Sequence, residues 1–217
     1  MGAIDVQSPR GTTVTLHPRD GTTDLATIGS TFRLWGTLHD EYGLADITTD
    51  GVLLDVGAHI GSVCIAFLVD NPNARAVAVE PLPENIACLY RNAESAGVSD
   101  RLTVLSGALG TDRIVYGPET HRYIGNIGGA SGEAIEVQER TLGELLDWSV
   151  PLVAMKVDCE GGEWAAFADP RIGEVPLIIG EYHGRGEAAL REALEPTHEV
   201  MILSEAGETG TFRAVLR

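Results

Sequence analysis

The chain has 217 residues, and its 15 basic and 32 acidic side chains give a formal net charge of −17. This length suits one α/β domain whose core closes without disulfides or metals. Hydrophobic residues make up 44% of the chain and charged residues 22%, which excludes a disordered or fibrous protein. Because nucleic acids and anionic membranes carry phosphate, the negative charge disfavours both as partners.

The cysteines are Cys64, Cys88 and Cys159, and they form no CxxC pair. Their odd number and wide spacing favour a reduced compartment. The first ten residues lack the pattern of a signal peptide, and no stretch approaches the roughly 18 apolar residues of a membrane span. We therefore expect a cytoplasmic protein, a monomer or homodimer, with a small-molecule partner.

The N-terminal part is expected to be an extension of one folding unit. Residues 1–30 are rich in Thr, Asp and Gly, which favours irregular or short-stranded structure. From Ser30, apolar residues recur at near-helical spacing and predict a lead-in helix that ends near Gly43. We assign residues 1–50 to this extension and 51–217 to the main domain.

From residue 52 onward, short apolar runs alternate with amphipathic stretches. The expected strands are 52–56, 76–79, 102–105, 152–157 and 177–181, and the expected helices are 61–69, 83–96 and 187–194. Such alternation predicts βαβ units and a mostly parallel sheet covered on both faces. Two last strands, 200–203 and 212–216, are joined by a short loop and must pair antiparallel.

Two shorter elements are expected in the middle of the chain. Residues 135–137 are a candidate edge strand. Thr141 and Glu144 form a capping-box pattern that opens a short helix through Leu146.

The segment Asp55–Gly61 places an acid and two glycines where a strand turns into a helix. Ligands of open α/β sheets bind at such turns. Gly57 allows a tight turn, Gly61 allows the helix and strand to approach, and Asp55 can accept hydrogen bonds from a cationic or amide-bearing ligand. The alternative is a turn that needs its glycines only for its own geometry.

The spacing of this segment differs from the dinucleotide fingerprint GxGxxG, which needs a glycine where the backbone approaches a pyrophosphate. His59 holds that place, and its side chain would block a diphosphate. Glu80 follows Gly61 by 19 residues and could bind two ribose hydroxyls. This acid suits any nucleoside cofactor, so an NAD(P)-dependent oxidoreductase stays an alternative, as does a non-catalytic nucleoside-binding module.

Several segments together carry a family resemblance: DVGAHIG at 55–61, VEPLPEN at 79–85, Asn92, TLGELL at 141–146, KVDCEGGE at 156–163 and GEYH at 180–183. In this order they resemble the FkbM-type methyltransferases over roughly residues 50–185. The chain departs from the family at His59, where Asn is usual, and at Gly162, where Ala is usual.

The resemblance implies a Rossmann-like class I methyltransferase fold. This α/β fold has a mostly parallel seven-stranded sheet, one antiparallel strand near the C-terminus and helices on both faces. The resemblance also implies S-adenosylmethionine as cofactor and a hydroxyl acceptor on a small molecule, such as a natural product or a sugar-containing metabolite. Carried over by position, the cofactor contacts are Asp55, Gly57, His59, Gly61, Glu80, Pro81, Asn85 and Asp158.

A hydroxyl acceptor needs a base, and titratable residues follow two neighbouring expected strands. The candidate catalytic residues are Asp158, Glu160, Glu181 and His183. Their alternative roles are a helix cap for Asp158, a helix N-terminal carboxylate for Glu160 and a satisfied loop position for His183. Asp158, Glu181 and His183 could hold a hard divalent cation, but no tight metal spacing supports this, and none is expected.

Substrate contacts are expected from the N-terminal part and from the loop after the third strand. The glycine-rich segment 125–132 has the composition of a lid or of a plain connection. The candidate substrate residues are His121, Tyr123, Asn126, Ser131 and Trp35.

Overall fold

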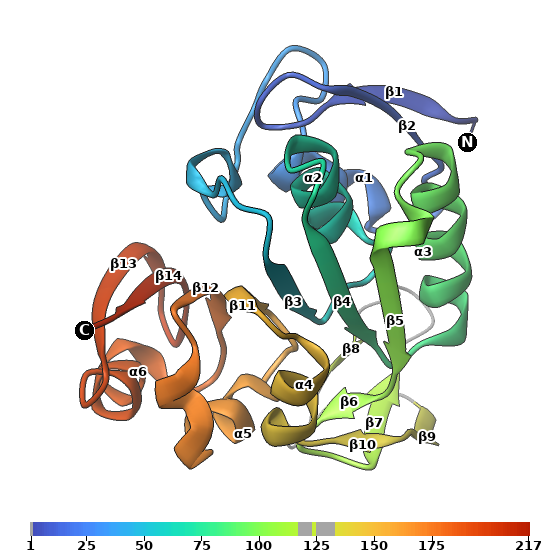
Figure 1. The fold of residues 1–217 in the computed structure, drawn as a ribbon. Helices are drawn as coiled ribbons and strands as arrows, with labels where there is room; N and C mark the ends of the chain where they lie inside the picture. The colour runs from blue at the N-terminus through green and yellow to red at the C-terminus, as the bar shows by residue number, and fades with distance from the viewer. Residues whose placement is uncertain (1, 117–122, 125–132) are drawn as a thin grey trace.

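The computed structural model describes residues 2–116, 123–124 and 133–217. Its main sheet has seven strands in the order β13–β14–β12–β11–β3–β4–β5 (Figure 1). The strands are β3 (Val52–Val56), β4 (Arg75–Glu80), β5 (Leu102–Ser106), β11 (Leu152–Val157), β12 (Leu177–Tyr182), β13 (His198–Ala206) and β14 (Thr209–Leu216). The pairings from β5 through β12 are parallel, and β14 runs antiparallel to both its neighbours. The predicted sheet is confirmed.

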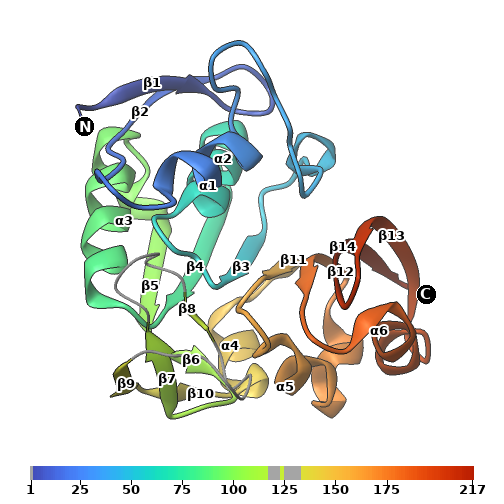
Figure 2. The ribbon, with the colours of Figure 1, turned by 180° about the vertical axis from the view of Figure 1, so that it is seen from behind.

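Helices cover both faces of this sheet (Figure 2). One face carries α1 (Asp24–Thr31), α2 (Ser62–Asp70) and α3 (Pro83–Ser95), and the other carries α4 (Leu142–Trp148), α5 (Glu163–Phe167) and α6 (Gly186–Leu194). Because side chains alternate along a strand, neighbours in β3 enter different cores. Leu53 packs with α2, and Leu54 packs with α4 and α5.

Smaller sheets flank the main one. Their strands are β1 (Ile4–Gln7), β2 (Thr13–Leu16), β6 (Ala108–Leu109), β7 (Arg113–Tyr116), β8 (Tyr123–Ile124), β9 (Glu133–Glu136) and β10 (Glu139–Arg140). The chain also forms the 3₁₀ turns η1 (Leu44–Asp46), η2 (Ser99–Arg101) and η3 (Pro170–Glu174). The edge strand expected at 135–137 overlaps β9, which lies at the edge of a separate three-stranded sheet and pairs with β7.

The lead-in helix predicted from Ser30 to Gly43 is wrong. The helix in this region is α1, which ends where the predicted helix begins, and the chain then turns. Leu34 and Thr37 exchange backbone hydrogen bonds of 2.9 and 3.0 Å across Trp35 and Gly36. Both turn residues have positive φ, which a helix cannot accommodate.

The N-terminal segment packs into the core of the sheet domain. Val6, Val14 and Leu16 are buried in the same hydrophobic cluster as Phe67 of α2. At α4, the Thr141 hydroxyl accepts a hydrogen bond from the backbone N–H of Glu144, as the capping pattern predicted. Within the described ranges, no helix is both long and apolar enough to cross a bilayer.

Candidate active site

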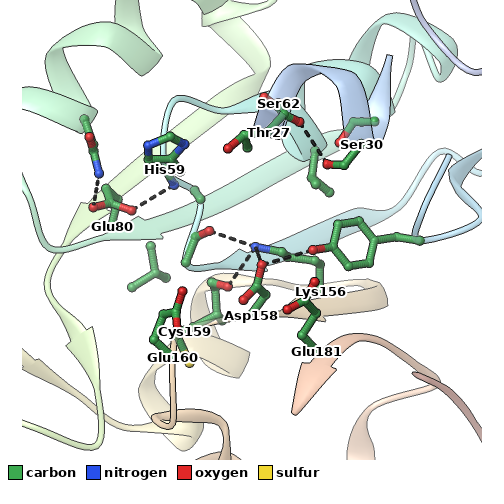
Figure 3. A pocket seen from close by; sticks show the side chains of 18 of the residues that line it. Thr27, Ser30, His59, Ser62, Glu80, Lys156, Asp158, Cys159, Glu160 and Glu181 are labelled. Carbon is green, nitrogen blue, oxygen red and sulfur yellow. Dashed lines mark hydrogen bonds and ion pairs between the residues drawn. The ribbon is translucent and has the colours of Figure 1, made fainter. Parts of the chain in front are cut away.

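A cavity of about 510 Å³ opens at the carboxyl ends of β3, β4, β11 and β12 (Figure 3). The chain passes from β3 to β4 on one side and places β11 on the other side of β3. The strand order reverses at such a point, and the helices before and after diverge to leave a crevice. Helix α1 and the segment after it form a further wall, through Thr27, Ser30 and Tyr42 among others.

The turn after β3 depends on glycine at its first position. Gly57 has a φ of +78°, and a Cβ there would lie 1.9 Å from the backbone oxygen of Asp158. Gly61 has a φ of +87°, and its Cβ would lie 3.0 Å from Leu89 of α3. Gly61 therefore permits close approach to α3, rather than to a strand as the sequence suggested.

Asp55 lies beneath the turn and does not line the cavity. It is fully buried, and its Oδ2 accepts a hydrogen bond from the backbone N–H of Cys64 at 3.1 Å. Its Oδ1 lies 3.5 Å from Lys156 Nζ. Asp55 therefore supports the turn from outside the cavity lining, and Gly61 likewise lies outside it, so the cofactor contacts expected of these two residues stay predictions.

Lys156 connects this turn to the neighbouring strand β11. A lysine inside an apolar strand is expected from the sequence to pair with a neighbouring carboxylate or to orient Asp158, and its ion pairs with Asp55 and Asp158 agree with this expectation. Its Nζ donates to the carbonyl of Gly57 at 2.8 Å and lies 3.8 Å from Asp158 Oδ2. Burial disfavours the ammonium, but Asp55 and Asp158 outweigh burial and raise the pKa of Lys156. The side chain stays charged and holds the two carboxylates on either side of the turn.

His59 lines the cavity as a neutral imidazole. Its backbone has a φ of +50°, and its N–H donates to Glu80 Oε2 at 2.8 Å. Its Nε2 lies 3.5 Å from Asp24 Oδ1, and within the described part of the chain it has no hydrogen-bond partner. Burial lowers the pKa of His59 to about 4, and the Asp24 carboxylate offsets only part of this.

Glu80 ends β4 and is almost fully buried at the cavity wall. Besides His59, it accepts from the backbone N–H of Leu82 and from Asn85 Nδ2, both at 3.0 Å and both at Oε1. A carboxylate offers about four lone-pair sites, and the described residues occupy three of them here. The remaining one, at Oε2, fits one ligand hydroxyl better than the pair expected from the sequence.

Arg19 joins the N-terminal segment to the end of the cavity near Glu80. The sequence did not indicate this role. It forms two side-chain hydrogen bonds with Asp24 and donates to Asn85 Oδ1 at 2.8 Å. Pro81 and Asn85 line the cavity, as does the segment 107–109 before and in β6. Arg19 and Asn85 are far apart in the sequence, so no local pattern could have paired them.

Asp158 lies at the opposite end of the cavity, directly after β11. The Tyr42 hydroxyl donates to its Oδ2 at 3.0 Å. Burial and the nearby Asp158 carboxylate raise the pKa of Tyr42 well above its usual range, so Tyr42 remains a donor. Asp158 is thus fixed by Tyr42 and Lys156, and it caps no helix because α5 begins only at Glu163.

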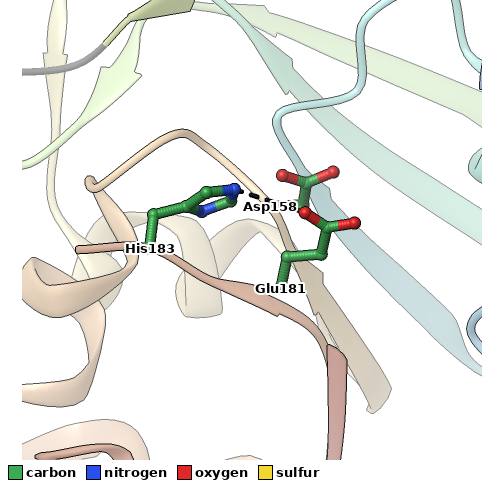
Figure 4. Close-up of side chains that lie close together, drawn as sticks. All are labelled: Asp158, Glu181 and His183. Carbon is green, nitrogen blue, oxygen red and sulfur yellow. Dashed lines mark ion pairs between the residues drawn. The ribbon is translucent and has the colours of Figure 1, made fainter. Parts of the chain in front are cut away.

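His183 faces a group of carboxylates (Figure 4). Its Nε2 lies 3.3 Å from Glu181 and 3.8 Å from Glu160, and its Nδ1 lies 3.2 Å from Glu163. Burial opposes protonation, but hydrogen bonds to Glu163 and Glu181 outweigh it and raise the pKa of His183 to about 10. At neutral pH the residue is a cation that orients carboxylates, which argues against its expected role as a base.

Glu160 lines the cavity, whereas the helix role considered for it belongs to Glu163. Glu163 Oε2 accepts a hydrogen bond from the backbone N–H of Gly161 at 2.9 Å. For the metal alternative, Asp158, Glu181 and His183 offer ligand atoms within 4.8 Å of one another. A metal ion bound there would require an unprotonated His183 nitrogen, so His183 would lose its ion pairs with Glu181 and Glu160.

Glu41 is a wall residue of the cavity that the sequence did not single out. Its backbone N–H donates to the carbonyl of Ser30 at 2.9 Å, and its carboxyl group lies near Glu181 and Asp158. Burial, followed by the charges of Glu181 and Asp158, raises the pKa of Glu41 to about 7. Only the tertiary structure brings Glu41 to the strand ends.

The expected substrate residues divide into two groups. Trp35 is 85% exposed and lies in a second hollow beside the cavity rather than in its floor. Tyr123 begins β8, and its backbone alone is described. His121, Asn126 and Ser131, with the rest of the segment 125–132, lie outside the described residues.

Comparison with known proteins identifies the class to which this site belongs. The sequence matches the "Methyltransferase FkbM domain" over residues 55–207, so the chain belongs to this family. Comparison with curated proteins gave no match.

Solved structures show the same fold. A methyltransferase FkbM from Methylobacillus flagellatus KT is 20% identical with a TM-score of 0.55, over 80% of this chain and 45% of that one. A putative rRNA-methylase from Clostridium thermocellum is 10% identical with a TM-score of 0.53, over 81% and 92%. An RNA methyltransferase from Salinibacter ruber in complex with S-adenosyl-L-homocysteine is 16% identical with a TM-score of 0.47, over 80% and 86%. The fold is thus that of the Rossmann-like methyltransferases, in agreement with the family match.

Proposed function

We propose that this protein transfers a methyl group from S-adenosylmethionine to a hydroxyl group of a small molecule. The observation that carries the proposal is a set of carboxylates at one end of the cavity, opposite the Glu80 end. They belong to Glu41, Asp158, Glu160 and Glu181. Bound S-adenosylmethionine would supply an electrophilic methyl group, and a carboxylate beside it can take the proton that a hydroxyl loses.

The residues at the other end fit the donor. Glu80 retains one acceptor site for a ribose hydroxyl, and Pro81 and Asn85 lie beside it for the adenosine part. Gly57 and His59 line the path from there to Asp158. Because the His59 imidazole occupies the place of the glycine in a dinucleotide fingerprint, the geometry favours a cofactor without a diphosphate.

The charge of the cavity favours a small molecule over a nucleic acid. Among the described lining residues, Lys156 is the sole lysine or arginine, and the turn carbonyl and two carboxylates engage it. Nucleic-acid binding gains most of its affinity from basic contacts to phosphate. A chain with a net charge of −17 supplies few of them.

Two measurements test this function. Calorimetry should show binding of S-adenosylhomocysteine and none of NADH. Methyl-labelled S-adenosylmethionine should then label members of a panel of hydroxylated small molecules, and product NMR should show the label on oxygen. NADH binding without S-adenosylhomocysteine binding would overturn the cofactor assignment, and label on nitrogen or on an RNA transcript would overturn the acceptor assignment.

A further inference from the structure

A second hollow, which we call the side groove, adjoins the cavity. It lies between α1 and the turn that follows, and its apolar lining comes from Leu25, Leu34 and Trp35. Ala26, Ser30 and Glu41 line both the side groove and the cavity. The two spaces are therefore neighbours, with Glu41 at their junction.

Trp35 is held in this groove at a conformational cost. It is the first central residue of the two-residue turn between Leu34 and Thr37, and it has a φ of +49° next to Gly36 at +88°. Positive φ at both positions is typical of a type I′ turn, which favours Asn, Asp or Gly. A bulky residue in this conformation is an outlier that points to a function, and at 85% exposure burial of its ring does not explain it.

Glu41 differs from the other carboxylates at the junction. Asp158 is fixed by Tyr42 and Lys156, and Glu181 lies 3.3 Å from protonated His183. Glu41 faces Ser30 and the carboxylates of Glu181 and Asp158. Its pKa of about 7 lies near neutral pH, and a general base is most effective when its pKa is close to the working pH.

We propose that the side groove binds the methyl acceptor. The acceptor is an uncharged or cationic molecule whose flat apolar part packs on Trp35, and Glu41 accepts the proton of its hydroxyl group. This inference rests on the proposed methyl transfer and specifies its acceptor.

The transfer balances without any further reactant. The hydroxyl oxygen forms a bond to the methyl carbon while the carbon–sulfur bond breaks, and the electron pair of that bond stays on sulfur. The hydroxyl proton passes to Glu41. The carboxylates of Glu41, Asp158 and Glu181 repel an anionic acceptor at the same place, and for this reason phosphorylated or carboxylated molecules are excluded from the acceptor class.

Three probes that share one ring and differ in charge test the groove: benzyl alcohol, benzylamine and benzoate. Each is titrated by NMR into the full chain saturated with S-adenosylhomocysteine. Benzyl alcohol and benzylamine should bind, and benzoate should bind at least about tenfold more weakly because of the carboxylates.

Trp35→Asn tests the ring contact without endangering the fold. Asn suits the turn, so the variant should melt about 2–4 °C higher than the wild type while binding benzyl alcohol at least about fivefold more weakly. Trp148→Ala is the matched control, since Trp148 is also exposed but ends α4 on the other face of the sheet. It should leave the affinity for benzyl alcohol unchanged.

Glu41→Gln tests the proton acceptor. Wild-type affinity for benzylamine should rise about threefold to tenfold between pH 6 and pH 8, as Glu41 loses its proton. The variant, which keeps His39 in the lining of the side groove, should show a smaller rise than the wild type, whereas Glu192→Gln, on the exposed surface of α6, should behave like the wild type.

The outcomes separate the two proposals. The groove assignment is overturned if no probe binds, if benzoate binds as tightly as benzyl alcohol, or if Trp35→Asn changes no affinity. An unchanged pH dependence in Glu41→Gln overturns the role of Glu41. If the wild type still binds S-adenosylhomocysteine, these results overturn only the groove proposal and not the proposed function. If the wild type does not bind S-adenosylhomocysteine, the proposed function itself is overturned.

Discussion

The two ends of the cavity use histidine in opposite ways. At the end near Glu80, burial lowers the pKa of His59 to about 4 and keeps it neutral. At the other end, burial also opposes the charge on His183, but Glu163 and Glu181 raise its pKa to about 10. The same side chain thus becomes a neutral wall in one place and a fixed cation in the other, according to the carboxylates that contact it.

This difference extends to the rest of each end. We call the end near Glu80 the donor end and the end near His183 the acceptor end, after the proposed function. Backbone groups shape much of the donor end, because Glu80 accepts from the N–H groups of His59 and Leu82 and the turn at Gly57 leads toward it. The acceptor end is built from charged side chains. Changes at the donor end should therefore affect folding and cofactor affinity, and changes at the acceptor end should affect pH dependence and turnover.

Gly57→Ala should have the largest effect, a loss of about 3 kcal/mol or more of unfolding free energy, because the new Cβ meets a backbone oxygen. Urea denaturation measures this loss. Gly97→Ala is the control, since Gly97 has a similar φ of +68° but open space around its Cβ. Equal losses in the two variants would show that conformation, not the contact with Asp158, makes Gly57 necessary.

His183→Gln should change the pH dependence of stability. The pKa of His183 is raised above its unfolded value, so its ion pairs contribute fully below about pH 6.5 and are lost as the pH rises through about 10. The wild type should exceed the variant by about 3 kcal/mol at pH 6, and this advantage should shrink toward pH 10. Denaturation curves at several pH values measure it, and a constant difference would contradict the charged state.

Asp158→Asn should lower turnover about 100-fold, or about 2.7 kcal/mol, with an affinity for S-adenosylhomocysteine that stays nearly unchanged. The amide still accepts a hydrogen bond from Tyr42 but no longer pairs with Lys156. Single-turnover methyl transfer and calorimetry give the two values. If cofactor affinity falls as much as turnover, Asp158 belongs to the donor end.

Glu80→Gln should have the smallest effect, a loss of about tenfold in S-adenosylhomocysteine affinity, because one charge-assisted hydrogen bond to ribose is weakened. Glu84→Gln, on the exposed first turn of α3, is the calorimetric control. An unaltered affinity would refute the ribose contact and with it the distinction between the two ends.

The local sequence was sufficient to predict an element where burial alone determines its structure. The apolar run Val52–Val56 is a strand buried on both faces, and its pattern is unambiguous. The region around Trp35 shows the opposite case, because apolar residues recur there at near-helical spacing while the chain forms a turn at Trp35 and Gly36. The apolar residues are Phe32, Leu34, Trp35 and Leu38. Periodicity there reflected contacts with α1 and the core, not a helix.

The residues of the site divide in the same way. Gly57 and Glu80 could be found from the sequence because Gly57 directly follows a strand and Glu80 ends one, each within a recognisable motif. Asp55 was found for the same reason, yet its neighbours Lys156 and Cys64 bury it beneath the turn. Glu41 and Arg19 carry no motif and could not have been found.

The sequence by itself determined the alternation of strands and helices, the antiparallel end of the sheet and the glycine turn, because each follows from local patterns of apolar residues and backbone freedom. Only the tertiary structure decided which charges meet. The Tyr42 hydroxyl donates to Asp158 across 116 positions of sequence, and Glu163, 20 positions from His183, contacts its ring and raises its pKa. Charge states depend on burial and on neighbours in space, and a linear pattern contains neither.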